Sequence, residues 1–119
     1  MLPKKHRLTD DYDFRRVRRL GRVFNTPLFS VSLAKSKIPG NIRFGFVLSN
    51  KISKRAVDRN RAKRILREVA MEKLKRFPPG FDIVFFSKRS LIGRSYEEVS
   101  FNFDKVLSEI SQKKASLQV

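Results

Sequence analysis

The sequence predicts a small α/β domain in which helices pack on one sheet, with elements in the order helix, two or three strands, helix, strand, helix. Three observations predict it. Apolar residues recur at helical spacing in three segments, short apolar runs of strand length lie between them, and turn residues separate the two kinds of segment. The 119 residues, 40% of them hydrophobic, fit one domain, 1–119, with flexible ends expected at about 1–6 and 113–119.

The first helix is expected over residues 8–20, where Phe14, Val17 and Arg18 fall on one face. Gly21 follows its last residue and is a natural stop. Residues that can cap free amides or suit the helix dipole crowd its start: Thr9, Asp10, Asp11 and Asp13.

Two strand candidates follow the first helix. In residues 28–34 (LFSVSLA), apolar residues alternate with Ser30 and Ser32, which indicates one buried face. Residues 38–41 (IPGN) form a turn. Residues 42–48 (IRFGFVL) are apolar at nearly every position, which is typical of a central strand covered on both sides.

The second half of the chain alternates helix, strand and helix. A helix is expected from about Ala56 to Arg76, ended by Pro78 and Pro79. Residues 83–87 (IVFFS) are a buried strand, and Ser95 with Glu98 matches a capping box that opens the last helix. One stripe of that helix is apolar: Val99, Phe103, Val106, Leu107 and Ile110.

Charge indicates the class of partner. The chain has 28 Lys and Arg against 11 Asp and Glu, a formal net charge of +17, which favours a polyanion such as RNA. A membrane partner is not expected, because no apolar run approaches the roughly 18 residues that span a bilayer. The sequence has no Cys and one His, His6, which excludes disulfides, zinc fingers and Cys nucleophiles. The start has no secretory pattern, so the expected location is cytoplasmic.

Residues 49–67 (SNKISKRAVDRNRAKRILR) concentrate this charge, with eight basic residues and one acid, Asp58. On a helix, the apolar side chains form a stripe that packs on the sheet: Ala62, Ile65, Leu66, Val69 and Ala70. Four polar side chains lie together on the opposite face: Asn60, Lys63, Arg64 and Arg67. Like charges four residues apart destabilise a helix, and a merely solvated face usually mixes both signs. The face therefore indicates binding of RNA phosphates by Arg forks.

A resemblance to a known family rests on three segments. Residues 59–64 (RNRAKR), preceded by 54–57 (KRAV), resemble the signature of the bacterial ribonuclease P protein family. In that family the signature follows a Gly-containing strand and a Lys-rich loop, and residues 45–51 (GFVLSNK) are similar to these. Residues 6–8 (HRL) with Asp13 and Phe14 resemble the family's opening helix, and residues 80–84 (GFDIV) resemble its last strand. The match covers roughly residues 5–110 in family order.

The resemblance implies a fold, an activity and partners. The fold is an α/β sandwich with a left-handed crossover, against the right-handed default. The activity is removal of the 5′ leader of precursor tRNA, with the chemistry performed by an RNA subunit that binds Mg²⁺. The partners are then ribonuclease P RNA and precursor tRNA. The candidates for binding the catalytic RNA are Lys54, Arg55, Arg59, Asn60, Arg61, Lys63, Arg64 and Arg67.

The resemblance also implies a leader cleft between the first helix and the sheet. Single-stranded RNA is held by aromatic platforms and cationic grooves. Phe14 matches the family's first cleft aromatic, although it fits a core position equally well, and Arg18 replaces the second aromatic. From the strands, Phe29, Val31, Phe44 and Phe46 are candidates for the cleft floor. The leader-binding candidates are Phe14, Arg18, Val31, Phe46, Lys51, Lys88 and Arg89.

No catalytic, metal-binding or small-molecule cofactor residue is expected in the protein itself. Acids at helix starts, among them Asp13 and Glu98, have ordinary capping roles, and His6 has no acid or Cys partner nearby. Three alternatives stay open. A ribosomal protein or RNA chaperone also explains charge and size, an autonomous nuclease would cleave without RNA, and a helix-turn-helix DNA-binding protein would need a short turn before the basic helix.

Overall fold

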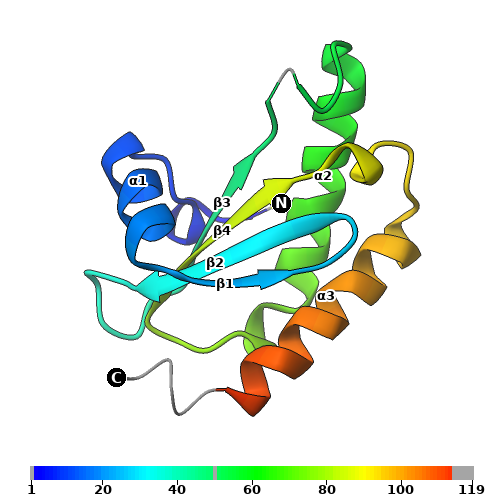
Figure 1. Ribbon diagram of the computed structural model, residues 1–119. Coiled ribbons are helices and arrows are strands. Elements are labelled where there is room, and N and C mark those ends of the chain that lie inside the picture. The colour runs from blue at the N-terminus through cyan, green and yellow to red at the C-terminus, as the bar shows by residue number, and fades with distance from the viewer. Residues whose placement is uncertain (1, 50, 114–119) are drawn as a thin grey trace.

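The structure is a computed structural model that describes residues 2–49 and 51–113, and it contains one four-stranded sheet with helices on both faces (Figure 1). The predicted fold class is confirmed. The elements are η1 (Lys4–His6), α1 (Asp11–Leu20), β1 (Arg22–Asn25), β2 (Phe29–Lys35), β3 (Arg43–Val47), α2 (Ala56–Glu72), η2 (Leu74–Arg76), β4 (Phe81–Ser87), η3 (Arg89–Leu91) and α3 (Tyr96–Gln112). Strand β1 is the third strand that the sequence analysis left optional.

The strand order is β1-β2-β4-β3, with β3 parallel to β4 and the other pairs antiparallel. The prediction that residues 42–48 form a central strand is therefore wrong, because β3 lies at an edge. The prediction that both of its faces are covered is confirmed, because helices lie against each of them. The Phe14 ring of α1 lies so close to Gly45 that an added Cβ would be 2.5 Å from it, and Phe44 is buried in the core on the other face.

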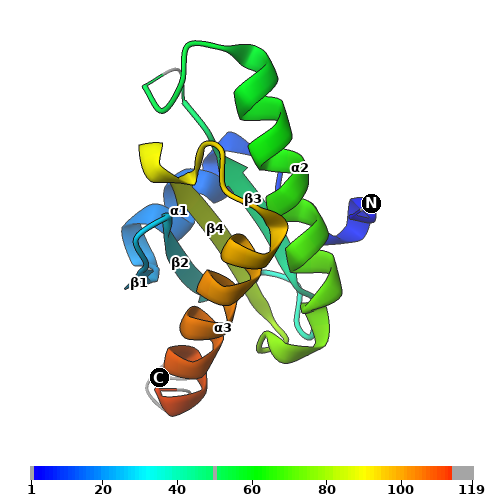
Figure 2. The ribbon, with the colours of Figure 1, turned by 90° about the vertical axis from the view of Figure 1, so that its right-hand side faces the viewer.

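The crossover from β3 through α2 to β4 is left-handed. Figure 2 shows α2 in front of the sheet, both strands running toward the loop that precedes α2, and β4 to the left of β3. A right-handed crossover, the strong default, would place β4 to the right. The handedness agrees with the family fold that the resemblance implied.

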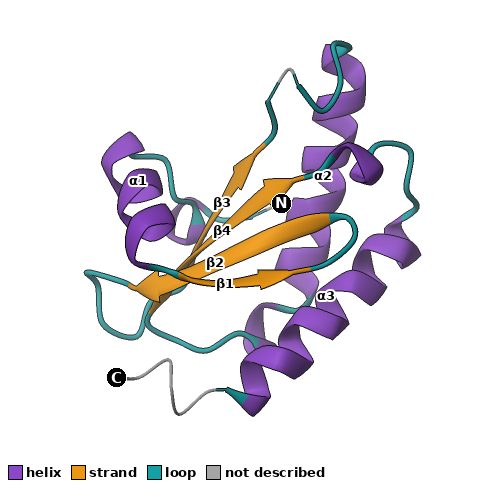
Figure 3. Cartoon of the chain, viewed as in Figure 1, coloured by secondary structure: helices purple, strands orange, loops and turns teal. Residues whose placement is uncertain are grey.

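The helices divide the molecule into three layers (Figure 3). Helices α2 and α3 cover one face of the sheet, and α1 covers the other. The large core lies beneath α2 and α3, and the five predicted apolar residues of each helix are buried there. The buried cluster under α1 has four members, Leu8, Val17, Ala34 and Val84, and three partly buried residues pack against it: Phe14, Val47 and Phe86. Both faces of residues 28–34 are therefore covered, not one as predicted. Ser32 is buried under α1, where its hydroxyl donates to the Val17 carbonyl at 2.9 Å.

A buried ionic cluster adds to the attachment of α1. Asp82 of β4 accepts hydrogen bonds from Arg16 of α1 and, at 2.9 and 2.8 Å, from Arg43 of β3. Asp13 accepts from Arg16 at 3.2 Å, so it is not a cap as predicted but a partner in this cluster. Hydrogen bonding to Asp82 raises the pKa of Arg43. Because the cluster joins three elements, it sets the position of α1 over the sheet.

The chain before α1, part of the end for which flexibility was predicted, contacts the sheet and the core. Leu2 is 1% exposed in the core, and the His6 Nδ1 lies 2.7 Å from the Ile42 carbonyl oxygen. The Leu8 N–H donates to the Phe44 carbonyl at 2.8 Å. Because Leu8 belongs to this edge contact, α1 begins three residues later than predicted, with Asp10 as its cap.

The other predicted boundaries are close to the observed ones. Helix α2 begins at Ala56 as predicted and ends at Glu72, with the turn η2 completing the segment before Pro78. The capping box of Ser95 and Glu98 is confirmed at the start of α3. Of the expected flexible end at 113–119, residues 114–119 lie outside the described part of the chain.

Candidate nucleic-acid interface

Helix α2 presents its polar side chains in two directions. Asn60, Arg61 and Arg64, here called the outer ridge, are exposed. Lys63 and Arg67, the inner pair, are half-buried. The prediction that the four residues 60, 63, 64 and 67 share one face is therefore only partly right. The inner pair turns toward β3 because the helix lies close to that edge strand, and the two residues line a cavity there with Phe46.

The outer ridge has no acidic partner among the described residues. Arg61 donates a hydrogen bond to the Arg94 carbonyl at 3.3 Å. Asp58 is the single acid in the first turn of α2, and it lies 3.8 Å from Arg55. Cations at a helix N-terminus oppose the helix dipole. The exposed charge therefore has a cost in the free protein that an anionic partner would relieve.

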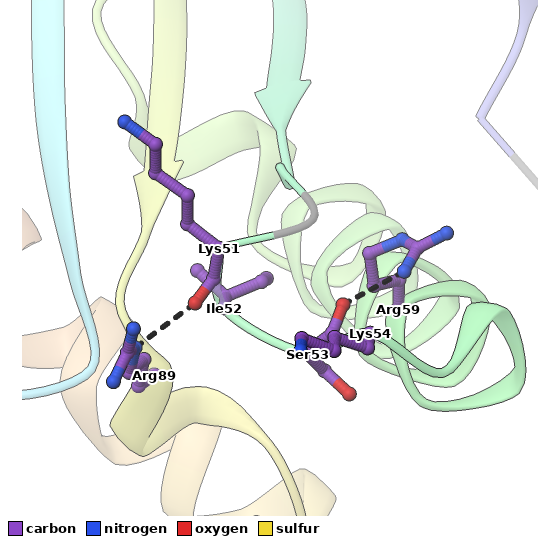
Figure 4. A pocket seen from close by; sticks show the side chains of 6 residues that line it. All are labelled: Lys51, Ile52, Ser53, Lys54, Arg59 and Arg89. Atoms are coloured by element: carbon purple, nitrogen blue, oxygen red, sulfur yellow. Dashed lines mark hydrogen bonds between the residues drawn. The ribbon is translucent and has the colours of Figure 1, made fainter.

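The loop before α2 forms a second basic surface, shown in Figure 4. A cavity of about 820 Å³ lies between this loop and the residues after β4. Its lining includes four cations: Lys51, Lys54, Arg59 and Arg89. Arg89 donates to the Lys51 carbonyl at 2.9 Å, and Arg59 donates to the Ser53 carbonyl at 2.7 Å. These two hydrogen bonds fix the loop, so Arg59 supports the surface as well as charging it.

A groove lies under α1, here called the α1 groove. Its first part has a volume of about 330 Å³ and is lined by Phe14, Arg18, Val47 and Phe86, among others. A second part of about 370 Å³ shares Arg18 and Phe86 with the first. The Arg18 guanidinium carbon lies 5.6 Å from the centre of the Phe86 ring, a cation–π contact. Cation and ring thus form one side and the floor of the same groove.

The predicted leader-binding residues divide among several places. Phe14 and Arg18 line the α1 groove. Val31 is 0% exposed in the core beneath α2 and α3, so its assignment to a cleft floor is wrong. Phe29 and Phe44 are buried in the same core, so their assignment to the cleft floor is wrong as well. The face of each strand that points to this core carries the larger side chains.

The remaining leader candidates lie near the strand ends. Phe46 stacks on Phe85 at 5.4 Å and lines the cavity of the inner pair rather than the α1 groove. Lys51 and Arg89 line the loop cavity. Lys88 is exposed, and its ammonium donates to the Thr26 carbonyl at 2.7 Å.

Val47 and Phe86 form the groove floor and were not predicted from the sequence. They are register partners on β3 and β4. A signal for Phe86 was present, because period-two alternation in residues 83–87 places it on the same face as Val84. The strand was instead interpreted as wholly buried, and its exposed end was overlooked.

Within residues 2–49 and 51–113, no group of three or more His, Cys, Asp and Glu is arranged to hold a metal ion. In the same ranges, no helix has the length and apolar character needed to cross a membrane.

Comparison with known proteins gives consistent matches. The family model described as Ribonuclease P matches residues 2–111. A ribonuclease P protein component of Nitratiruptor sp. is 34% identical over 104 residues, covering 87% of this chain and 87% of the relative. One from Herpetosiphon aurantiacus is 30% identical over 108 residues, covering 91% of this chain and 86% of the relative.

Solved structures show the same fold. A mutant of the Staphylococcus aureus RNase P protein superposes with a TM-score of 0.82 at 23% identity, covering 91% of this chain and 90% of that chain. The RNase P protein from Thermotoga maritima gives a TM-score of 0.76 at 27% identity, covering 87% and 96%.

Proposed function

The chain belongs to the ribonuclease P protein family, as the protein component of an endoribonuclease, and from that premise we propose which RNA each of its surfaces binds. The outer ridge binds the catalytic RNA. The α1 groove holds the 5′ leader of precursor tRNA. The observation that carries the proposal is that these two surfaces lie on opposite faces of one sheet, each with cations that point to solvent.

The outer ridge suits a folded RNA surface. Its apolar underside is anchored by Ile65, Leu66 and Val69, so the exposed Arg side chains extend from a fixed helix. Arg pairs with phosphate through a planar fork and stacks on bases, which favours Arg61 and Arg64 as contacts. Asn60 adds an amide that can donate and accept hydrogen bonds.

The α1 groove suits single-stranded RNA. Phe86 and Phe14 offer apolar ring surfaces, and Arg18 offers a planar cation beside them. Bases stack on such surfaces with little dependence on sequence. The loop cavity is lined by Lys51 and Arg89, which follow the strand ends at Val47 and Phe86 along the chain. Single-stranded RNA that extends from the groove past these strand ends would therefore meet Lys51 and Arg89, which can bind its phosphates.

The chemistry belongs to the RNA partner in this proposal. Mg²⁺ bound mainly by the RNA would supply the metal-assisted hydrolysis. The described acids fit structural roles instead, with Asp82 and Asp13 in the ionic cluster and Glu98 in a capping box. This chain binds and orients the two RNAs, and we place it with precursor tRNA in the cytoplasm.

The deciding experiment is precursor-tRNA processing by catalytic RNA at low Mg²⁺, with and without this chain. The proposal predicts that the chain restores leader removal when Mg²⁺ is limiting. A chain that only assists RNA folding in general, as a ribosomal protein or chaperone would, gives no rescue specific to this RNA. Cleavage by purified chain alone in Mg²⁺ would instead assign the chemistry to the protein.

A further inference from the structure

A third basic cavity lies at the outer edge of β3, separate from the outer ridge and next to the α1 groove, with which it shares Phe14. Its volume is about 250 Å³. Residues from three elements and the segment before α1 meet there: Arg7 of that segment, Phe14 of α1, Phe46 of β3, and Lys63 and Arg67 of α2. The cavity therefore exists only in the folded chain, and no sequence motif describes it.

The three cations of this cavity lack anionic partners. Among the described residues, none of Arg7, Lys63 and Arg67 takes part in an ion pair, and no acidic residue lines the cavity. Burial, and then the charge of Arg67, lower the pKa of Lys63. Lys63 and Arg67 are half-buried cations that repel one another, and such a pair favours an anion between them, while the exposed Arg7 also lines the cavity.

The apolar part of the cavity consists of aromatic rings. Phe14 lies over Gly45, and the Phe46 ring is held by stacking on Phe85 at an interplanar angle of 21°. Both rings are half-buried, so part of each is open to a ligand. Flat apolar surface beside clustered cations is the combination that binds a nucleotide, whose base stacks while its phosphate pairs.

The edge of β3 adds groups that can bind the edge of a base. The Phe44 carbonyl accepts from the Leu8 N–H at this edge. The N–H and C=O groups of successive residues point to alternate edges of a strand. The N–H and C=O of Phe46 therefore point to the same outer edge as those of Phe44, past the segment that ends its contact with β3 at Leu8. A volume of about 250 Å³ lies below the range of roughly 300–1,000 Å³ for drug-sized ligands. The site fits one phosphate and one flat ring, not a duplex.

We propose that this cavity binds a single nucleotide unit of single-stranded RNA, with the phosphate among Arg7, Lys63 and Arg67 and the base against Phe14 and Phe46. The inference rests on the proposed function for the origin of the strand and deepens it. Helix α2 then serves two ligands, because its outer ridge binds folded RNA while its inner pair binds an unpaired nucleotide.

The test uses the full chain without catalytic RNA, so it is independent of the processing assay. Binding of adenosine 5′-monophosphate, adenosine, inorganic phosphate and a single-stranded RNA tetranucleotide is followed by isothermal titration and by NMR of the backbone amides. We expect the mononucleotide to bind more tightly than phosphate or adenosine, with the largest shifts at Phe46 and Arg67. The tetranucleotide should bind more tightly still.

Substitution of Lys63 supplies the matched comparison. Lys63→Gln should weaken mononucleotide binding by roughly tenfold, the effect of one charge-assisted hydrogen bond. Lys63→Arg should largely keep it. Lys105→Gln is the control, since Lys105 also lies over a ring, that of Phe101 at 4.9 Å, but on the outer side of α3. Circular dichroism verifies that each variant is folded.

Four outcomes would overturn the proposal. Equal losses for Lys63→Gln and Lys105→Gln would indicate general attraction by a basic protein. A mononucleotide that binds no better than phosphate would remove the base site. A mononucleotide that binds as tightly as the tetranucleotide would assign the cavity to a free nucleotide. A folded Lys63→Arg variant that loses mononucleotide binding would contradict the role of Lys63 in binding the phosphate. Loss of processing rescue with normal nucleotide binding would count against the proposed function alone.

Discussion

The carboxylate of Asp82 accepts two hydrogen bonds from the guanidinium of Arg43, at 2.9 and 2.8 Å, within the sheet face that α1 covers. The Asp82 side chain is 0% exposed and that of Arg43 is 17% exposed. Arg16 of α1 donates to the same carboxylate. Four buried apolar residues lie under α1, with Phe14, Val47 and Phe86 packed against them, and this ionic contact adds to what holds the helix, and with it the α1 groove, in place.

Replacing Asp82 by Asn is therefore expected to destabilise the protein. Two guanidinium groups would lose their shared charge partner, which costs about 3–5 kcal/mol for a buried pair. Urea unfolding measures the loss. Asp104→Asn is the matched control, since Asp104 pairs with Lys73 and Arg76 at 2.7 Å but its side chain is 45% exposed. A pair at the surface contributes about 1 kcal/mol or less. Similar losses for the two variants would contradict the role of the ionic cluster.

The outer ridge can be tested with Arg64→Ala, alone and together with Asn60→Ala. Both side chains are exposed, so the fold should be retained while binding to ribonuclease P RNA weakens by roughly tenfold per lost charged contact. A binding titration with circular dichroism checks both parts. Lys75→Ala removes an exposed cation outside the proposed surfaces and serves as the control. A lost fold with normal affinity per folded molecule would count against the ridge.

Binding to the RNA should weaken steeply with salt. Each phosphate that the protein neutralises adds roughly 0.7 to 0.9 to the slope of log K against log salt concentration. Arg64→Ala should reduce that slope by about one. Titrations at several salt concentrations measure it, and a flat response would show that charge does not drive binding.

Gly45→Ala addresses the position of Phe14. An added Cβ would lie 2.5 and 2.7 Å from two carbons of the Phe14 ring, so the ring must move away from β3. We expect weaker binding of precursor tRNA with its leader and unchanged binding of mature tRNA to the reconstituted holoenzyme. Equal effects on both ligands would argue against a leader contact by Phe14.

The capping box predicts a pH dependence of stability. The pKa of Glu98 lies below its ordinary value of 4.5, chiefly because of the Ser95 backbone N–H and also because of Arg94. Because the pKa of Glu98 is lower in the folded state than in the unfolded state, the ionised carboxylate stabilises the fold above pH 4.5. That contribution to the unfolding free energy is lost as the pH falls through the pKa of the folded state. Glu98→Gln should therefore flatten the acid limb of the unfolding free energy, measured by urea from pH 7 to pH 3. Glu97→Gln, an exposed neighbour, should leave that limb unchanged.

Local signals explain why several elements were predicted closely. The cap of α3 involves residues three apart, and the stripe of α2 recurs within two helical turns, so both are properties of short segments. Strand β1 was left optional because it has four residues, of which Phe24 is the buried one. Such a strand has too few buried positions to give a periodic signal.

Which helix covers which face of each strand could not be predicted from short segments. Val31 and Phe86 are both apolar strand residues, yet one is in the core and the other floors the α1 groove. Which face meets which helix depends on the β2-β4 register and on the left-handed crossover, and these pair residues far apart along the chain. Local pattern contains no information about that choice.

By itself, the sequence determined the helices, the apolar underside of α2, the excess of positive charge and the family, because each depends on residue types at short spacing. The tertiary structure alone decided that β3 is an edge strand, that Asp82 joins Arg16 and Arg43, and that Lys63 and Arg67 turn away from Arg64. The reason is physical. The direction in which a half-buried side chain can point is set by the space that packed neighbours leave, and those neighbours come from other parts of the chain.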